Sequence, residues 1–273
     1  MVLPYSEGSF SPIVELQQIE ISGHTCFFIS MTNPNPTPSQ TDFEQLGYVQ
    51  FNGFAAERQL NDLENELSEF IRNVVPEMPP EKVFYENKND PGSLKQIQNL
   101  FDFSPFFQSL MFDSPYERLA KQLLGTEVVG INMQYFNKPP AISKPTPPHQ
   151  DGYYFMLEPN HALTMWLALD ETDEENGCVR YVPGSNRNGL RNHAQTQVLG
   201  FSQGITDYGS TDHEQELALH LMPGDLLAHH SMTVHRADGN RSSTRQRRAI
   251  GFIYYSADAV ESPEKKNQGT KLV

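Results

Sequence analysis

The middle of the chain contains the run His149-Gln150-Asp151-Gly152-Tyr153-Tyr154-Phe155, and a further histidine, His235, follows far downstream. Side chains alternate between the two faces of a strand, so His149 and Asp151 are expected to point the same way while Gln150 points elsewhere. A histidine from a second strand would complete a face of two imidazoles and one carboxylate. Such a face leaves coordination positions open, and it suits non-haem Fe(II) and O₂ better than a closed zinc site.

Two other histidines compete with His235 for the third ligand position. A strand is predicted over 225–229, and it would bring His229 and the adjacent His230 near the same region. Only His235 is followed at a suitable distance by a Gly-Asn-Arg turn and a basic strand. The sequence therefore predicts that His149, Asp151 and His235 are the metal ligands, with the other two as pocket or core histidines.

The composition excludes several classes of partner. The chain has 34 acidic and 20 basic residues and a net charge of -14, which argues against binding to nucleic acid or to an anionic membrane surface. An anionic ligand would need a local cluster of lysines and arginines. Cys26 and Cys178 are too few for a disulfide framework, and no apolar run is long enough for a membrane span. We expect a soluble, cytoplasmic protein that acts on a small molecule; the oligomeric state is left open.

The pattern of apolar and turn residues predicts a mainly β fold with flanking helices. Apolar residues at helical spacing predict a helix over 55–74, and a second helix over 115–124 is predicted between Ser114 as N-cap and Gly125. Short strands then alternate with Gly and Pro turns, which is typical of a double-stranded β-helix, the jelly roll of cupin-like proteins. The predicted strands are 47–51, 127–136, 161–170, 176–182, 217–221, 225–229 and 247–255.

The chain is predicted to contain one catalytic domain with an extension at each end. Residues 1–40 form either an added edge hairpin, with strands over 13–21 and 25–31, or a loose tail. Residues 41–257 form the jelly-roll domain, and residues 258–273 a flexible tail. Within the domain, residues 186–214 are polar and irregular, so a functional loop such as a lid is expected there.

Several motifs occur in the order found in a known family. From about residue 42 to residue 257 the chain resembles the phytanoyl-CoA dioxygenase family of Fe(II)/2-oxoglutarate oxygenases. The matching stretches are Asn137-Lys138-Pro139-Pro140, His149-Gln150-Asp151 with Tyr154-Phe155, Trp166, Asn176-Gly177-Cys178, Pro183-Gly184-Ser185, Pro223-Gly224-Asp225, and His235 leading to Arg247-Arg248-Ala249-Ile250.

The resemblance implies roles for individual residues. It assigns the iron ligands to His149, Asp151 and His235, and it makes Arg247 the residue that pairs with the far carboxylate of 2-oxoglutarate. A guanidinium suits this role because it donates two parallel hydrogen bonds to a carboxylate. The resemblance further implies cosubstrate contacts by Gln134, Trp166 and Lys95.

The chain departs from the family pattern at two positions. The spacer between His235 and Arg247 is one residue longer than usual, so Arg245 or Arg248 could take the anchoring role. Ala237 stands where the family often has Ser, which would remove one hydroxyl contact to the cosubstrate.

These features predict a dioxygenase that uses Fe(II), 2-oxoglutarate and O₂ to hydroxylate or otherwise oxidise an unactivated C–H bond, releasing succinate and CO₂. The carboxylate of Asp151 favours this over halogenation, which needs that position for chloride. Two alternatives stay open: a non-catalytic cupin-type metal-binding module, and a Zn or Mn hydrolase or isomerase on the same scaffold. The identity of the substrate depends on loops outside the barrel, which fold analogy does not specify.

Overall fold

The structure is a computed structural model that describes residues 13–21, 24–32, 39–198 and 201–261. Contacts divide the chain into two compact units, Met1–Ser39 and Gln40–Val273. In the first unit, β1 (Ile13–Ile21) pairs antiparallel with β2 (His24–Thr32), as the sequence predicts for a hairpin. The flexible C-terminal tail stays a prediction, because most of it lies outside the described residues.

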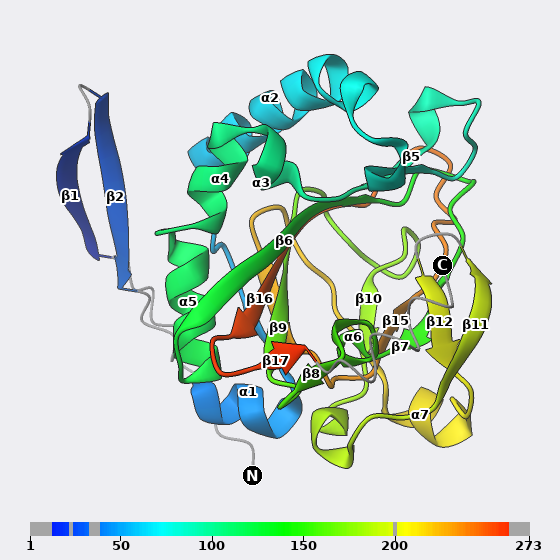
Figure 1. Cartoon of the computed structure of the whole chain (residues 1–273). Helices are drawn as coiled ribbons and strands as arrows, with labels where there is room; N and C mark the ends of the chain where they lie inside the picture. The colour runs from blue at the N-terminus through cyan, green and yellow to red at the C-terminus, as the bar shows by residue number, and fades with distance from the viewer. Residues whose placement is uncertain (1–12, 22–23, 33–38, 199–200, 262–273) are drawn as a thin grey trace, which may run out of the picture. The chain divides into compact units, whose positions relative to one another are not determined.

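The second unit is built around two large antiparallel sheets, with two further strand pairs beside them (Figure 1). This arrangement is the predicted mainly β jelly roll. The larger sheet has the strand order β3 (Tyr48–Phe51), β14 (Leu226–His230), β9 (Ala162–Ala168), β16 (Arg248–Ser256), β6 (Val128–Asn137), β5 (Leu94–Ile97) and β4 (Val83–Tyr85). The smaller sheet has the order β13 (Leu217–Ala218), β10 (Val179–Tyr181), β15 (His235–Ala237) and β7 (Thr146–His149).

Helices near the N-terminal end of this unit lie along the larger sheet, beside the long strand β6 (Figure 1). Helix α5 has the bounds that its sequence predicts, because the Ser114 hydroxyl accepts a hydrogen bond from the Glu117 amide at 3.2 Å and Gly125 ends the helix in the left-handed region. The helices are α1 (Gln40–Leu46), α2 (Glu57–Asn73), α3 (Leu100–Phe103), α4 (Pro105–Met111), α5 (Pro115–Leu124), α6 (Asp151–Phe155) and α7 (Ser210–Gln215), with 3₁₀ turns at Val75–Glu77, Pro80–Lys82, Pro91–Ser93 and Ser185–Asn188.

Strand β9 is buried along its whole length, as its apolar sequence predicts. Its residues Leu163, Met165 and Leu167 belong to the large core that includes helices α2 to α5. The alternate residues Trp166 and Ala168 belong to a second cluster with side chains from β10 and β14. Because the two clusters lie on opposite faces of one strand, β9 separates the helical layer from the interior of the jelly roll.

The prediction that residues 186–214 are irregular is wrong. This segment is not irregular: it contains the antiparallel pair β11 (His193–Val198) and β12 (Phe201–Ile205), followed by α7. The sequence His-Ala-Gln-Thr-Gln-Val has too few apolar residues to show the alternation of a half-buried strand. The short elements β4, β5, α3 and α4 also escaped prediction, as did β8 (Leu157–Glu158) and β17 (Val260–Glu261), which pair with each other.

We predict that Gly224→Ala lowers the free energy of unfolding by about 3 kcal/mol. Gly224 has a φ of +92°, and a Cβ atom there would lie 2.5 Å from the backbone oxygen of Ala55. The matched control is Gly53→Ala, since Gly53 also has a positive φ, +61°, but its Cβ would meet nothing within 4 Å. Urea denaturation of both variants measures the difference, and equal losses would contradict the packing argument.

Candidate metal centre

The two predicted histidine ligands come from neighbouring strands of the smaller sheet. His149 is the last residue of β7 and His235 is the first residue of β15, and the two are directly paired in the antiparallel register. Their ring centres are 4.1 Å apart. Strand pairing therefore brings together two imidazoles that are far apart in the sequence.

The third predicted ligand, Asp151, is not on the strand that the predicted alternation assumed. Strand β7 ends at His149, and Asp151 begins the short helix α6. Gln150 between them keeps an extended backbone, with φ -122° and ψ 128°, so the alternation continues for one more residue. The Gln150 side chain points the other way and donates to the carbonyl oxygens of Gly189 and Met232.

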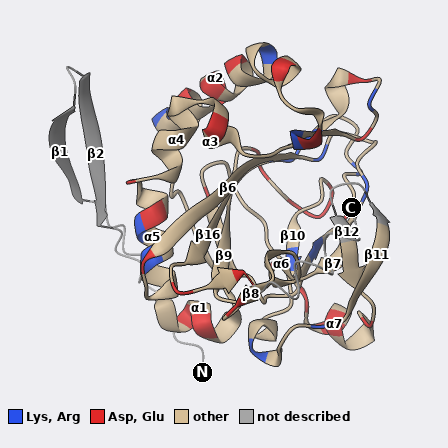
Figure 2. Cartoon of the chain, in the orientation of Figure 1, with Lys and Arg blue, Asp and Glu red and all other residues tan. Residues whose placement is uncertain are grey.

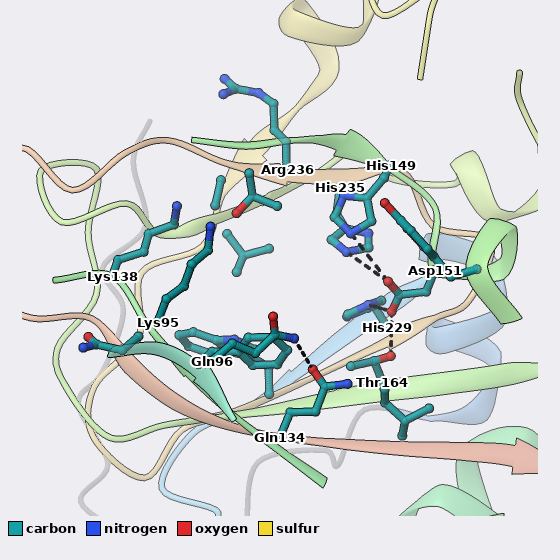
Figure 3. A pocket seen from close by; sticks show the side chains of 18 of the residues that line it. Lys95, Gln96, Gln134, Lys138, His149, Asp151, Thr164, His229, His235 and Arg236 are labelled. Carbon is teal, nitrogen blue, oxygen red and sulfur yellow. Dashed lines mark hydrogen bonds and ion pairs between the residues drawn. The ribbon is translucent and has the colours of Figure 1, made fainter. Parts of the chain in front are cut away.

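The potential ligand atoms of the three side chains converge (Figure 3). Nε2 of His149 lies 3.5 Å from Oδ1 of Asp151, and Nε2 of His235 lies 3.7 Å from the same oxygen. All three ligand atoms are within 4.8 Å of one another. A single ion could contact all of them, and two nitrogens with one carboxylate oxygen suit non-haem Fe(II).

Hydrogen bonds orient both imidazoles for metal binding. Nδ1 of His149 lies 2.8 Å from the carbonyl oxygen of Pro147, and Nδ1 of His235 lies 3.0 Å from that of Thr233. Each Nδ1–H donates to its carbonyl, which leaves the Nε2 lone pair facing the centre. Burial and the neighbouring histidines hold the pKa of His235 well below its usual value, so this ring is neutral, the form that binds a metal.

The Asp151 carboxyl group is ionised in its buried position. Burial by itself raises its pKa, but the neighbouring histidines, among them the hydrogen-bonded His229, outweigh burial and hold the pKa well below its usual value. The outer oxygen, Oδ2, accepts hydrogen bonds from Oγ1 of Thr164 at 2.6 Å and from Nε2 of His229 at 3.0 Å. The inner oxygen, Oδ1, faces the two histidines.

The two competing histidines lie outside the group of three. His229 contacts the outer oxygen of Asp151 and the hydroxyl of Tyr181. The ring of His230 packs near Phe43 and His161, with ring centres 6.0 Å and 5.8 Å away.

The remaining predicted site residues share one cavity of about 240 Å³ with the three proposed ligands. The guanidinium carbon of Arg247 lies 5.0 Å from the centre of the Trp166 ring, and Oε1 of Gln134 accepts a hydrogen bond from Gln96 at 2.7 Å. Lys95 also lines the cavity, 3.5 Å from a carboxylate oxygen of Glu86. Side chains from β5, β6 and β9, together with Arg247 just before β16, thus line the same cavity as the proposed metal ligands.

Of the three candidate arginines, Arg247 alone lines this cavity. It is 6% exposed, and its Nε atom has no hydrogen-bond acceptor among the described residues. Burial lowers its pKa to about 10, so it remains protonated at neutral pH. Arg245 is paired with Asp173 and Glu175. Arg248 is likewise engaged, with Asp170 and Glu64 as its partners.

Basic residues outnumber acidic residues in the cavity lining, whereas acidic residues outnumber basic residues in the whole chain. Acidic residues lie over the surfaces of α1, α2 and α7 (Figure 2). The cavity, by contrast, is lined by four lysines or arginines and two carboxylates. This is the local cationic cluster that an anionic ligand requires in a chain of net charge -14.

Sequence reasoning missed several residues that complete the site. Lys138 belongs to a motif that was noticed, but its place in the cavity was not predicted. Thr164 and Tyr181 lie in buried strands, where an apolar pattern gives no signal for a polar side chain that faces the site. His229 was expected as a pocket or core histidine, and it lines the cavity. Ala237 does line the cavity, where its methyl group offers no hydrogen bond.

Comparison with known proteins identifies the family of the chain. The family model for phytanoyl-CoA dioxygenase matches residues 43–249. A phytanoyl-CoA dioxygenase of Arabidopsis thaliana is 28% identical over 262 residues, covering 83% of this chain and 89% of the relative.

Solved structures share the fold. EvdO2 from Micromonospora carbonacea var. aurantiaca, complexed with 2-oxoglutarate, has a TM-score of 0.67 at 25% identity and covers 85% of this chain and 94% of its own. The non-haem α-ketoglutarate-dependent carbocyclase SnoK from nogalamycin biosynthesis has a TM-score of 0.66 at 22% identity, over 88% of this chain and 92% of its own.

The jelly roll and its face of two histidines and one carboxylate, taken with these relatives, define an Fe(II)- and 2-oxoglutarate-dependent dioxygenase. The chain belongs to the phytanoyl-CoA dioxygenase family. Among the residues that the structure describes, no helix combines the length and apolar character needed to cross a membrane.

We predict that Asp151→Ala weakens Fe(II) binding by more than about 100-fold, because loss of a ligand exceeds the 10- to 100-fold effect typical of groups around the ligands. Anaerobic competition with a chromogenic chelator measures the affinity. Asp207→Ala is the control, since Asp207 is an exposed carboxylate paired with Arg191. Unchanged affinity in the Asp151 variant would overturn its assignment as a ligand.

Proposed function

We propose that this protein uses O₂ to hydroxylate an unactivated C–H bond of a small molecule: one oxygen atom enters the substrate and the other enters succinate, as 2-oxoglutarate is converted to succinate and CO₂. The proposal is carried by one cavity. It is lined by His149, Asp151 and His235 and also by the buried, protonated Arg247. These are the groups that a metal and a dicarboxylate need side by side.

In this proposal Arg247 holds the far carboxylate of 2-oxoglutarate. Its guanidinium is fixed above Trp166 and has an unsatisfied donor, so a carboxylate would supply the missing acceptor. Lys95 and Gln134 line the same cavity and are placed for further polar contacts with the cosubstrate. EvdO2, whose structure contains 2-oxoglutarate, supports this use of the site.

The remaining residues hold and shield the reaction site. His149, Asp151 and His235 would hold the iron on one face and leave the opposite positions free for other ligands. The iron, with 2-oxoglutarate and O₂, supplies the oxidising power when bound. Tyr154, Phe155 and other aromatic and apolar side chains of the cavity limit the access of water.

The carboxylate of Asp151 supports hydroxylation over halogenation, because halogenation needs its coordination position for chloride. The substrate is proposed only as a small molecule. SnoK is a carbocyclase from nogalamycin biosynthesis, so the fold by itself does not specify the substrate. A cytoplasmic location stays a prediction from the sequence.

The first test distinguishes the proposal from its two alternatives. We expect anaerobic addition of Fe(II) and 2-oxoglutarate to give the weak visible charge-transfer band of a keto acid bound to ferrous iron. A cupin-type metal-binding module, or a Zn or Mn hydrolase or isomerase, would bind metal without this band. Its absence in protein that binds Fe(II) would therefore reject the oxygenase.

The second test concerns the anchor. We predict that Arg247→Lys raises the concentration of 2-oxoglutarate needed for half-maximal succinate release by about 10-fold or more, because an ammonium group cannot reproduce the two-point contact of a guanidinium. Arg245→Lys is the matched control, because Arg245 is paired with Asp173 and Glu175 outside the cavity. If Arg245→Lys had the larger effect, the anchor would be misassigned.

A further inference from the structure

His229 occupies a position that neither the fold nor the metal ligands explain. It lies near the end of β14 and is 4% exposed, and its Nε2 is 3.0 Å from Oδ2 of Asp151. Thr164 on β9 is its direct partner in the strand register, and its hydroxyl lies 2.6 Å from the same oxygen. Two neighbouring strands thus present two donors to one carboxylate oxygen (Figure 3).

We propose that Thr164 and His229 form a carboxylate clamp that fixes Asp151 as a ligand through one oxygen. The clamp holds Oδ2, and Oδ1 is the oxygen that faces His149 and His235. Because Oδ2 already accepts two hydrogen bonds, only Oδ1 is available to coordinate a metal. The clamp therefore keeps open the coordination position that a two-oxygen contact would occupy, and it aims Oδ1 at the centre.

Tyr181 sets which nitrogen of His229 carries the proton. Its hydroxyl lies 2.8 Å from Nδ1 of His229, and the phenol is fully buried on β10, with its ring stacked on Tyr48 at 4.8 Å. A phenol is not ionised at neutral pH, so the Tyr181 hydroxyl donates a hydrogen bond to Nδ1. Nε2 then carries the ring hydrogen, which makes His229 a donor to Asp151 and not a ligand through that nitrogen.

The hydrogen bonds around Asp151 connect it to both sheets. The chain of hydrogen bonds runs from Tyr181 in the smaller sheet, through His229 in the larger sheet, to Asp151 in α6. Asp151 is joined to the strand of His149 only by Gln150, so it has no strand pairing of its own to fix its side chain. The clamp supplies the missing constraint from the opposite sheet. His229 and Thr164 are therefore positioning residues that act through Asp151.

The clamp is tested by the affinity of the metal-free protein for Co(II) alone, measured by titration of the visible absorption bands. We expect His229→Leu and Thr164→Val each to weaken binding by about 10- to 100-fold. His229→Gln should stay within a few fold of the unsubstituted protein, because its amide can still donate to Oδ2. His230→Leu is the control, since His230 is the neighbouring buried histidine and its ring packs against Phe43 and His161.

Thermal unfolding of each metal-free variant shows whether it is folded. Unchanged affinity in folded His229→Leu, or an equal loss in the Leu and Gln variants, would overturn the clamp. If His229→Leu does not fold, Thr164→Val and Tyr181→Phe decide: weaker Co(II) binding in both supports the clamp, and unchanged binding in either rejects it.

The inference rests on the metal centre of the proposed function but not on its oxidation reaction. A protein that binds Co(II) but releases no succinate with any substrate would fail the proposed function, while the clamp could still be measured. A protein that releases succinate, with variants that bind Co(II) normally, would fail the clamp alone.

Discussion

The site depends on one carboxylate that is mostly shielded from water. The Asp151 side chain is 15% exposed, and it carries its charge between two imidazoles. Removing an ion from water costs several kcal/mol unless partners replace its hydration. Thr164 and His229 replace it at one oxygen, and the other oxygen faces the place where a cation would bind. A metal ion bound there would compensate the negative charge of Asp151, which the fold holds largely away from water.

The rest of the jelly roll places the partners of this carboxylate. Pairing of β7 with β15 sets His149 opposite His235, and pairing of β9 with β14 sets Thr164 opposite His229. The first pair belongs to the smaller sheet and the second to the larger sheet, so the carboxylate lies where the two sheets meet. Arg247 directly precedes β16, and its guanidinium lies over Trp166 of β9, the strand that pairs with β16. Strand register thus places the two proposed histidine ligands and the two hydrogen-bond partners of Asp151.

Features that depend on local sequence could be predicted well. Helix α5 has a capping serine, a proline in its first turn and a terminal glycine, and each acts within a few residues. His149 and Asp151 are close in sequence, so a short extended segment suffices to align them. The strand pair β11 and β12 could not be predicted, because its side chains are mostly polar. The roles of Thr164 and His229 could not be predicted either, since they arise from strand pairing across the sheet, which the local pattern does not specify.

The turn and basic strand that follow His235 favoured it over His229 and His230, and the resemblance to a family supplied the role of Arg247, which local rules could not. The structure places both residues in the expected cavity and gives Arg245 and Arg248 other partners. It also shows that the alternation behind the His-x-Asp argument holds although Asp151 begins a helix. The reason is the extended backbone of Gln150, whose side chain ties the segment to Gly189 and Met232.

Anomalous diffraction at the iron absorption edge, from crystals prepared anaerobically with Fe(II), tests the central claim most directly. The account predicts one strong peak within about 2.2 Å of Nε2 of His149, Nε2 of His235 and Oδ1 of Asp151, with Oδ2 still hydrogen-bonded to His229. A peak bonded to both oxygens of Asp151 or to His229, or no peak at this cluster, would contradict it.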